Sequence, residues 1–377
     1  MSDDTQVGTG QRGPTGSGHT VGLWASLRDR QLGLVVVGSL VVLAVSAFVQ
    51  IRYGSYAMTD RMVFEAVFDP AVVANPSVLA NLLLGGPFPE VDNTTLIVWK
   101  LRIPRIFVGV MVGANLAAAG AIFQAVTRNE LASPYILGVS SGAGLAVLAV
   151  LILLPVLSGY LPFVAAAGGT AAFLLVYAIA WQNGTSPVRL ILAGVVVTTI
   201  CHSLQTGLFF FAGNTGVVQT ALSWLTGSLT STDWGDVRLA LPWTLLVLGL
   251  AVAGSRQLNV LLLGERTAGS LGMRVERVRF GLSAVAILAT AVSVAVAGLV
   301  GFVGLVVPHL VRNLVGSDYR RLLVGCLFVG PALVTAADVG ARLALSPIQL
   351  PVGIVTGLLG GPYFLYLLRK NQRLGDI

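Results

Sequence analysis

Residues 261–279, LLLGERTAGSLGMRVERVR, determine how this chain is organised, because they form a polar interruption between two long apolar stretches. The interruption contains three glycines, and positions 256–279 hold five arginines and two glutamates. Glycine permits sharp bends, so short helices joined by glycines can project from a membrane surface. Such an element suits a membrane protein that receives force from a partner. It predicts the membrane half of a pump whose motor is a separate chain.

The composition places the chain in the membrane. Of its 377 residues 55% are hydrophobic and only 10% are charged, with a mean hydropathy of +0.85. Soluble domains contain about 25% charged residues, and a helix needs about 20 apolar residues to span a bilayer. Four stretches lack Asp, Glu, Lys and Arg altogether, at 131–188, 190–232, 280–311 and 343–368. The only cysteines, Cys201 and Cys326, lie in apolar runs and are interpreted as small buried side chains.

The apolar pattern predicts an all-α, polytopic integral membrane protein with about ten transmembrane helices. Ten spans place both termini on the same side of the membrane, and nine or eleven spans are the alternatives. The expected spans are 32–51, 103–125, 136–155, 162–181, 187–211, 239–256, 278–297, 300–315, 321–338 and 351–368.

The basic residues give the orientation. With the termini inside, the inner segments hold sixteen of the 23 Lys and Arg residues and the outer segments hold seven. This bias follows the positive-inside rule, and the long outer loop 52–95 carries five acidic residues. The net charge of +7 does not indicate nucleic-acid binding, because the basic residues alternate with spans and form no single stripe.

Three regions are expected along the chain. Residues 1–31, with five glycines before His19, are expected to be a disordered cytoplasmic tail. This polar tail is too long for a signal peptide. Residues 32–370 form the transmembrane domain, with a cytoplasmic loop at about 257–277, and residues 371–377 form a second cytoplasmic tail.

Close helix packing is expected where small residues recur four positions apart. Three glycine pairs have this spacing, Gly109/Gly113, Gly138/Gly142 and Gly353/Gly357.

The spans carry almost no ionisable group. Ion-coupled carriers usually keep such a group at mid-membrane. Here only His202 and His309 qualify, and hydrogen bonding to a neighbour is the more common role for a lone histidine in an apolar helix. No Gly-x-x-x-x-Gly-Lys-Ser/Thr sequence is present, so the chain is expected not to hydrolyse ATP by itself. No metal site and no cofactor are expected.

One short motif resembles a catalytic one. The sequence GVSSG at 138–142 fits the Gly-x-Ser-x-Gly pattern of nucleophile elbows, but it opens an expected membrane helix instead of a strand–turn–helix unit. An intramembrane protease, with Ser140 or Ser141 facing His309, is the enzymatic alternative. Helix packing by serine and glycine is favoured over it.

The interrupting loop allows two interpretations. Gly264, Gly269 and Gly272 permit bends between short helices, and Glu265 and Arg266 at the first bend are placed to meet a charged groove on a partner. Alternatively, the loop rests on the headgroups and its arginines contact anionic lipid. The residues alone do not decide between them.

Several segments, in order along the chain, resemble the permease subunits of ABC importers for metal chelates, the family that includes vitamin B12, ferric siderophore and haem importers. The likeness covers roughly residues 32–370. It rests on LRIPR at 101–105, VGANLAAAGAIFQ at 112–124, RNELASP at 128–134, LGVSSGAG at 137–144, the loop quoted above, GFVGLVVPHLVR at 301–312 and LPVGIVTG at 350–357.

The resemblance implies an assembly and a set of site residues. Two permeases form the channel as a homodimer, two cytoplasmic ATP-binding subunits drive it, and an extracytoplasmic binding protein delivers the chelate. Arg102, Arg105 and Arg342 correspond to cations that dock the binding protein, although anchoring of these arginines at the lipid interface is the simpler alternative. The helix at about Leu190 to Gly213 corresponds to the pathway-lining helix. The ATPase-coupling residues implied are Gly264, Glu265, Arg266, Ala268, Leu271 and Gly272.

Cobalamin is the preferred cargo, with ferric siderophore or haem as close alternatives. No residue carries that preference. An ion-coupled carrier is a more distant alternative.

Overall fold

The computed structural model describes residues 17–375 except positions 55, 57, 183 and 347, and within these residues the chain is all-helical. Ten helices correspond to the ten expected spans. They are α1 (Ser17–Arg52), α6 (Ile103–Val126), α7 (Val139–Leu153), α8 (Leu161–Ala180), α9 (Pro187–Phe209), α11 (Trp234–Ala253), α14 (Val275–Ala297), α15 (Val303–Val315), α16 (Tyr319–Leu343) and α17 (Val352–Gly375).

The polytopic architecture is confirmed. In the described part of the chain seven helical segments are long and apolar enough to cross a membrane, and three shorter apolar helices lie at 139–153, 303–315 and 352–366. At the N-terminus the expectation differs from the structure, because α1 begins at Ser17 whereas 1–31 was expected to be disordered. No proline interrupts positions 19–52, so the helix extends outward from the span. Residues 1–16 of the expected tail lie outside the described residues.

The outer segment 52–95 is helical, which corrects the expectation of a loop. It contains α2 (Asp60–Val67), α3 (Pro70–Val73), α4 (Pro76–Leu84) and α5 (Asn93–Ile97), and the π-helical turn η1 (Val98–Arg102) joins α5 to α6. Side chains of Thr59, Asp69, Asn75 and Asp92 accept hydrogen bonds from the first turns of these helices. These capping residues were the overlooked sequence signal.

Four further short helices complete the chain. The 3-10 helix η2 (Pro155–Tyr160) precedes α8, and α10 (Thr215–Thr226) begins after the capping side chain of Asn214. Helices α12 (Ser255–Leu262) and α13 (Glu265–Ser270) lie between α11 and α14.

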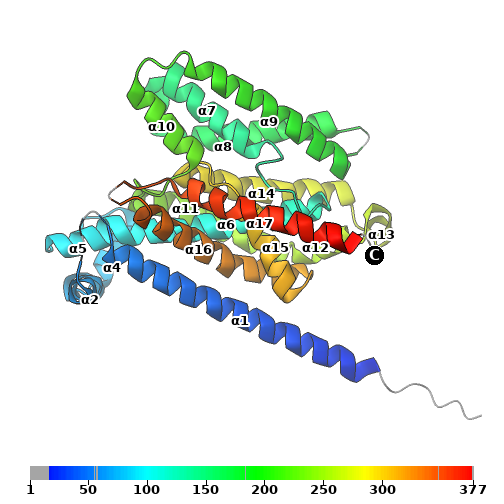
Figure 1. Cartoon of the computed structure of the whole chain (residues 1–377), viewed down its shortest axis with the longest axis horizontal. Helices are drawn as coiled ribbons and strands as arrows, with labels where there is room; N and C mark the ends of the chain where they lie inside the picture. The colour runs from blue at the N-terminus through cyan, green and yellow to red at the C-terminus, as the bar shows by residue number, and fades with distance from the viewer. Residues whose placement is uncertain (1–16, 55, 57, 183, 347, 376–377) are drawn as a thin grey trace, which may run out of the picture.

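Helix α6 is the centre of the bundle. It packs against α16, α14, α15 and α11, whereas α7 to α10 form a separate group on one side and α1 lies along the opposite side against α16 (Figure 1). Of the most apolar window of Asn93–Val126, 83% is buried, compared with 6% for α1. The small side chains of α6 therefore let it lie inside the protein, whereas α1 faces mainly lipid.

Glycines set the closest helix approaches. A Cβ on Gly113 would lie 2.4 Å from the carbonyl oxygen of Gly330 on α16, and one on Gly120 would lie 1.8 Å from that of Gly304 on α15. The expected packing role is confirmed in the same way for Gly142 and Gly353, whereas Gly357 has no neighbour nearer than 3.9 Å.

The two ends of the bundle differ. Helix α13, the C-terminal end of α17 and the N-terminal end of α1 lie at one end, whereas α2, α4 and α5 lie at the other (Figure 1). The two ends of the described chain therefore share a side with the loop around α13.

Candidate functional site

The loop between α11 and α14 folds into two short helices joined by sharp bends. Gly264, between α12 and α13, has φ +96°, and Gly272, after α13, has φ +81°. These values favour glycine, so the expected bends at Gly264 and Gly272 are confirmed. Gly269 does not form a bend, because it lies inside α13.

The surface of α13 is defined by Arg266, Leu271 and Gly272, which are exposed. Leu271 is 64% exposed, so its side chain is available for contact with a partner. Ala268 is 0% exposed, and its expected role in ATPase coupling stays a prediction. Its methyl group packs α13 against the protein.

Glu265 binds two arginines of this chain. Its Oε1 accepts a hydrogen bond from Arg279 on α14 at 2.7 Å and lies 3.7 Å from Arg128 in the α6–α7 turn. The side chain is still 43% exposed, and the expectation that it meets a charged groove on a partner stays a prediction. Its carboxylate is used to hold α13 to the bundle.

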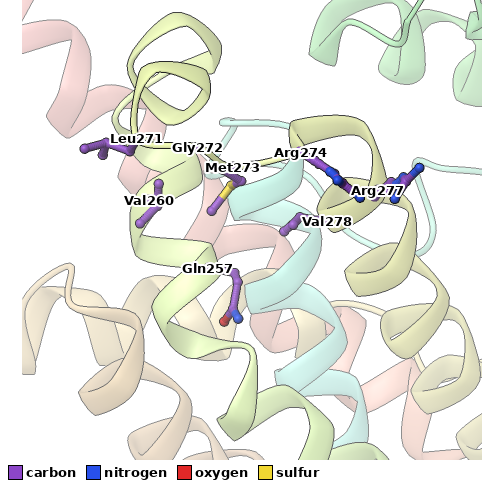
Figure 2. Close-up of a pocket in the computed structure, with 8 residues that line it drawn as sticks. All are labelled: Gln257, Val260, Leu271, Gly272, Met273, Arg274, Arg277 and Val278. Carbon is purple, nitrogen blue, oxygen red and sulfur yellow. The ribbon is translucent and has the colours of Figure 1, made fainter.

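Two hollows flank α13. One, of about 490 Å³, lies between α12 and the start of α14, with Val260, Leu271 and Met273 along one side and Arg274 and Arg277 along the other (Figure 2). The second, of about 550 Å³, is lined by the following residues of α13 and its neighbours: Arg128, Ser186, Pro187, Val188, Leu263, Gly264, Glu265, Arg266 and Thr267. Residues 264–272, here called the ridge, border both hollows, the first through Leu271 and Gly272 and the second through Gly264 to Thr267.

The ridge and the first hollow are cationic. In the described part of the chain Arg266, Arg274 and Arg277 are exposed and form no ion pair, whereas both glutamates of the loop are bound to Arg279. The surface offered to a partner is therefore positive and partly apolar. Such a surface is complementary to acidic groups set among apolar side chains.

A polar cluster joins the α6–α7 turn to α15. Glu130 lies 3.0 Å from the guanidinium of Arg312 and 3.5 Å from Nδ1 of His309, both on α15. The hydrogen bond to His309, with the charge of Arg312, lowers the pKa of Glu130 below its usual value. The carboxylate therefore stays ionised well below neutral pH and ties the turn to α15.

The three arginines expected to dock a binding protein are buried, at 5% exposure for Arg102, 3% for Arg105 and 8% for Arg342. Arg102 donates to the carbonyls of Ile51 and Tyr56. This burial leaves the three side chains little surface for a partner or for lipid headgroups, and their docking role stays a prediction.

Their partners show what these arginines do. Arg105 donates to both carboxylate oxygens of Asp338 on α16, at 2.8 and 2.7 Å. Arg342 donates to the carbonyls of Gln50 and Tyr53, at 2.7 and 2.9 Å. Arg102 and Arg342 thus satisfy carbonyls at the C-terminal end of α1, which otherwise lack partners.

The helix expected to line the pathway is α9. Its buried side packs on α7 and α8 and includes Ala193, Val197 and Gln205. Its other side is uncharged after Arg189 and carries the exposed apolar residues Leu192, Val195, Val196, Ile200 and Leu204. A role in the pathway stays a prediction.

The residues that resemble a catalytic set do not form one. The Ser141 hydroxyl donates to the carbonyl of Gly138 at 3.1 Å, whereas His309 lies against Glu130. His202 bonds to Tyr135 at 3.1 Å and to Gln205 at 3.2 Å, the neighbour-bonded role expected for it. Cys201 and Cys326 are buried free thiols. Ser140 and Ser141 are therefore packing residues of α7.

Sequence reasoning missed the buried network around Arg279. It counted Arg279 among the loop cations, yet the residue is 1% exposed. A signal was present, because position 279 falls inside the expected span 278–297, and a charge within a span needs a partner. Its partners are Glu265, Glu276 and Thr185.

Comparison with known proteins places this geometry in a family context. The model of the FecCD transport family matches residues 40–370. The Fe(3+)-citrate import system permease protein YfmD of Bacillus subtilis is 43% identical over 279 residues, 74% of this chain and 83% of that protein. The cobalamin import system permease protein BtuC of Halobacterium salinarum is 42% identical over 282 residues, 74% of this chain and 75% of that protein.

A solved structure supports the same relationship. It is described as an inward-facing conformation of a transporter assigned to the metal-chelate type of ABC transporters. It superposes with a TM-score of 0.75 at 26% identity and covers 90% of this chain and 99% of its own.

Proposed function

Because this chain belongs to the FecCD transport family, whose members are permeases of metal-chelate ABC importers, we propose that α13 is the element through which a partner ATPase drives it. The chain is a multi-pass protein of the cytoplasmic membrane and a permease subunit, not an enzyme. In the proposed assembly two copies enclose the pathway, two ATP-binding subunits bind the end that carries α13, and both termini are cytoplasmic.

The observation that carries the proposal is the ridge of α13 between two hollows. Its exposed Arg266 and Leu271 have no partner in the described part of the chain, and the adjoining hollow adds Arg274 and Arg277. A loop that only rests on lipid headgroups does not need a raised segment between hollows. A ridge flanked by recesses, in contrast, offers shape complementarity to a cleft on a partner. The loop is therefore interpreted as an ATPase contact in preference to a headgroup contact.

The binding protein is proposed to dock at the opposite end, where α2 to α5 lie (Figure 1). Arg102 and Arg342 are buried beneath this surface and hold the end of α1 in place. In this proposal they position the docking surface and do not contact the binding protein.

The cargo is proposed to be a metal chelate, either a ferric chelate or a corrinoid. The uncharged exposed face of α9 supports a pathway through which a bulky chelate slips without being held. No residue of the chain distinguishes cobalamin from a ferric chelate. A ferric-citrate permease and a cobalamin permease are 43% and 42% identical to this chain. The chelate class is therefore the cargo proposed.

Reversing the charge of the ridge tests ATPase docking. Arg266→Glu is expected to lower co-purification of the partner ATPase roughly tenfold. The reason is that it places a negative charge against a surface of the ATPase that is proposed to be acidic. Arg256→Glu is the matched control, since Arg256 is exposed on α12 and stands outside the ridge. Equal recovery of the ATPase with both variants would remove α13 from the docking site.

Uptake assays test the transport function and the cargo. Cells lacking the gene are expected to lose uptake of either labelled ferric citrate or labelled cobalamin, and complementation should require an intact nucleotide site in the partner ATPase. Transport that continues with a hydrolysis-deficient ATPase would support the carrier alternative. Unchanged uptake of both chelates would refute the cargo class.

A further inference from the structure

Resting on the proposed function, we infer that Arg279 is the positioning residue that transmits movement of α13 to α9, through contacts with Glu265 on one side and Thr185 on the other. The ridge contacts the motor but is distant in sequence from the helix that faces the pathway. A physical connection between them is required if movement of one is to reach the other.

The connection is made by a single guanidinium. One terminal nitrogen of Arg279 donates to Glu265 on α13 at 2.7 Å. The other donates to the carbonyl of Thr185 at 2.6 Å and to its hydroxyl oxygen at 3.0 Å. The planar fork of arginine holds two partners in fixed directions, which a lysine ammonium does not do.

Glu276 locks this arrangement from within α14. It accepts from Arg279 at 2.8 Å, from the backbone N–H of Thr185 at 3.1 Å and from the Thr185 hydroxyl at 2.9 Å. Tyr177 on α8 also donates to it, at 3.2 Å. Elements α8, α13, α14 and the α8–α9 turn therefore meet in one network.

The position of Thr185 gives the network its mechanical consequence. Thr185 is 3% exposed and directly precedes Ser186. The Ser186 hydroxyl caps the N-terminus of α9. Because a helix is a rigid element, a displacement of the buried, hydrogen-bonded residue at its start moves the whole helix. A displacement of α13 that carries Arg279 with it is thereby applied to the base of α9.

Burial makes the connection strong. The Arg279 side chain is 2% exposed, whereas those of Glu265 and Glu276 are 43% and 35% exposed, so its ion pairs are shielded from water and salt on the arginine side. Glu265 also lies 3.7 Å from Arg128, so the cations and carboxylates of the network balance. Removing Arg279 leaves Glu276 without its cation, leaves Glu265 with only Arg128 at 3.7 Å, and releases α13 from the α8–α9 turn.

The test separates docking from transmission. The full complex with Arg279→Gln is expected to retain ATPase co-purification and ATP hydrolysis within about twofold, while chelate transported per ATP falls about tenfold, the equivalent of losing hydrogen bonds to a charged group. Arg279→Lys should be nearly as uncoupled, because one ammonium cannot reproduce the fork. Arg256→Gln, the same change at an exposed site, is the control and should stay coupled.

A fluorophore on Leu192→Cys gives a readout that does not depend on transport. Leu192 is 61% exposed on α9, and ATP binding should change its emission in the otherwise wild-type complex but not with Arg279→Gln. Loss of the ATPase from the complex would show that Arg279 merely shapes the ridge and would overturn the inference. Normal coupling and a normal emission change would overturn it as well.

Two further results keep the outcomes distinct. If the Arg279→Gln permease itself does not fold and insert, so that ATPase binding cannot be scored, Thr185→Val serves instead, because it removes only the hydroxyl bonds and should lower transport per ATP about threefold. Unchanged coupling in that variant would contradict the inference. Failure of the wild-type chain to bind any ATPase would instead refute the proposed function.

Discussion

Replacing Arg105 with methionine is expected to lower the free energy of unfolding by about 3–5 kcal/mol, because it leaves the carboxylate of Asp338 buried without a counter-charge. Both side chains are almost fully buried, and the two hydrogen bonds between them join α6 to α16. Thermal unfolding in detergent should show an earlier transition and a lower yield of monodisperse protein.

The double variant Arg105→Met with Asp338→Leu provides the control. It removes both charges together, so its loss of stability is expected to be smaller than that of Arg105→Met alone, because no uncompensated charge remains. If the double variant is instead less stable than either single variant, the pair contributes net attraction and the cost assigned to an orphaned charge is wrong.

Replacing Gly120 with valine is expected to prevent the bundle from assembling. Already a single Cβ at this position would lie 1.8 Å from the carbonyl oxygen of Gly304, so α6 and α15 would have to move apart. Overpacking a core commonly costs about 1–3 kcal/mol, and backbone separation along the central helix should exceed that range. The expected observation is aggregated protein on size-exclusion chromatography after extraction.

Gly281→Ala is the matched comparison, because no atom lies within 4 Å of a Cβ at Gly281 on α14. Alanine in a helix is favoured over glycine by roughly 0.5–1 kcal/mol, so this variant should be as stable as the natural chain or slightly more so. A folded Gly120→Val protein with a normal transition temperature would show that α6 and α15 do not touch as the structure has them.

The spans could be predicted from the sequence because the lipid interior offers no hydrogen-bond partners. An apolar segment there forms a helix, which pairs its own backbone N–H and C=O groups. Long charge-free stretches therefore sufficed to place all ten helices. The short outer helices were missed since their signal lies in single capping residues such as Asp69 and Asn75, not in hydropathy. Helix α10 was missed for the same reason.

The site was predicted in position but not in detail. The bends at Gly264 and Gly272 followed from residue type, whereas the inward turn of Glu265 depends on Arg279, which is fourteen positions away in the chain. The burial of Arg102 and Arg342 likewise depends on the end of α1, which no local pattern reveals. Contacts between distant segments set exposure, and exposure decides whether an arginine can meet a partner.

The capping of α1 by arginines of other helices has a consequence for biogenesis. Arg342 bonds the carbonyl of Gln50, 292 positions earlier in the chain, and α1 otherwise exposes most of its surface to lipid. During synthesis α1 can therefore enter the bilayer first and bond to Arg102, but its bonds to Arg342 form only after α16 has emerged from the ribosome. The packing of the first helix is thus completed only near the end of synthesis, and a chain halted before α16 lacks the contacts of α1 with Arg342 and with α16.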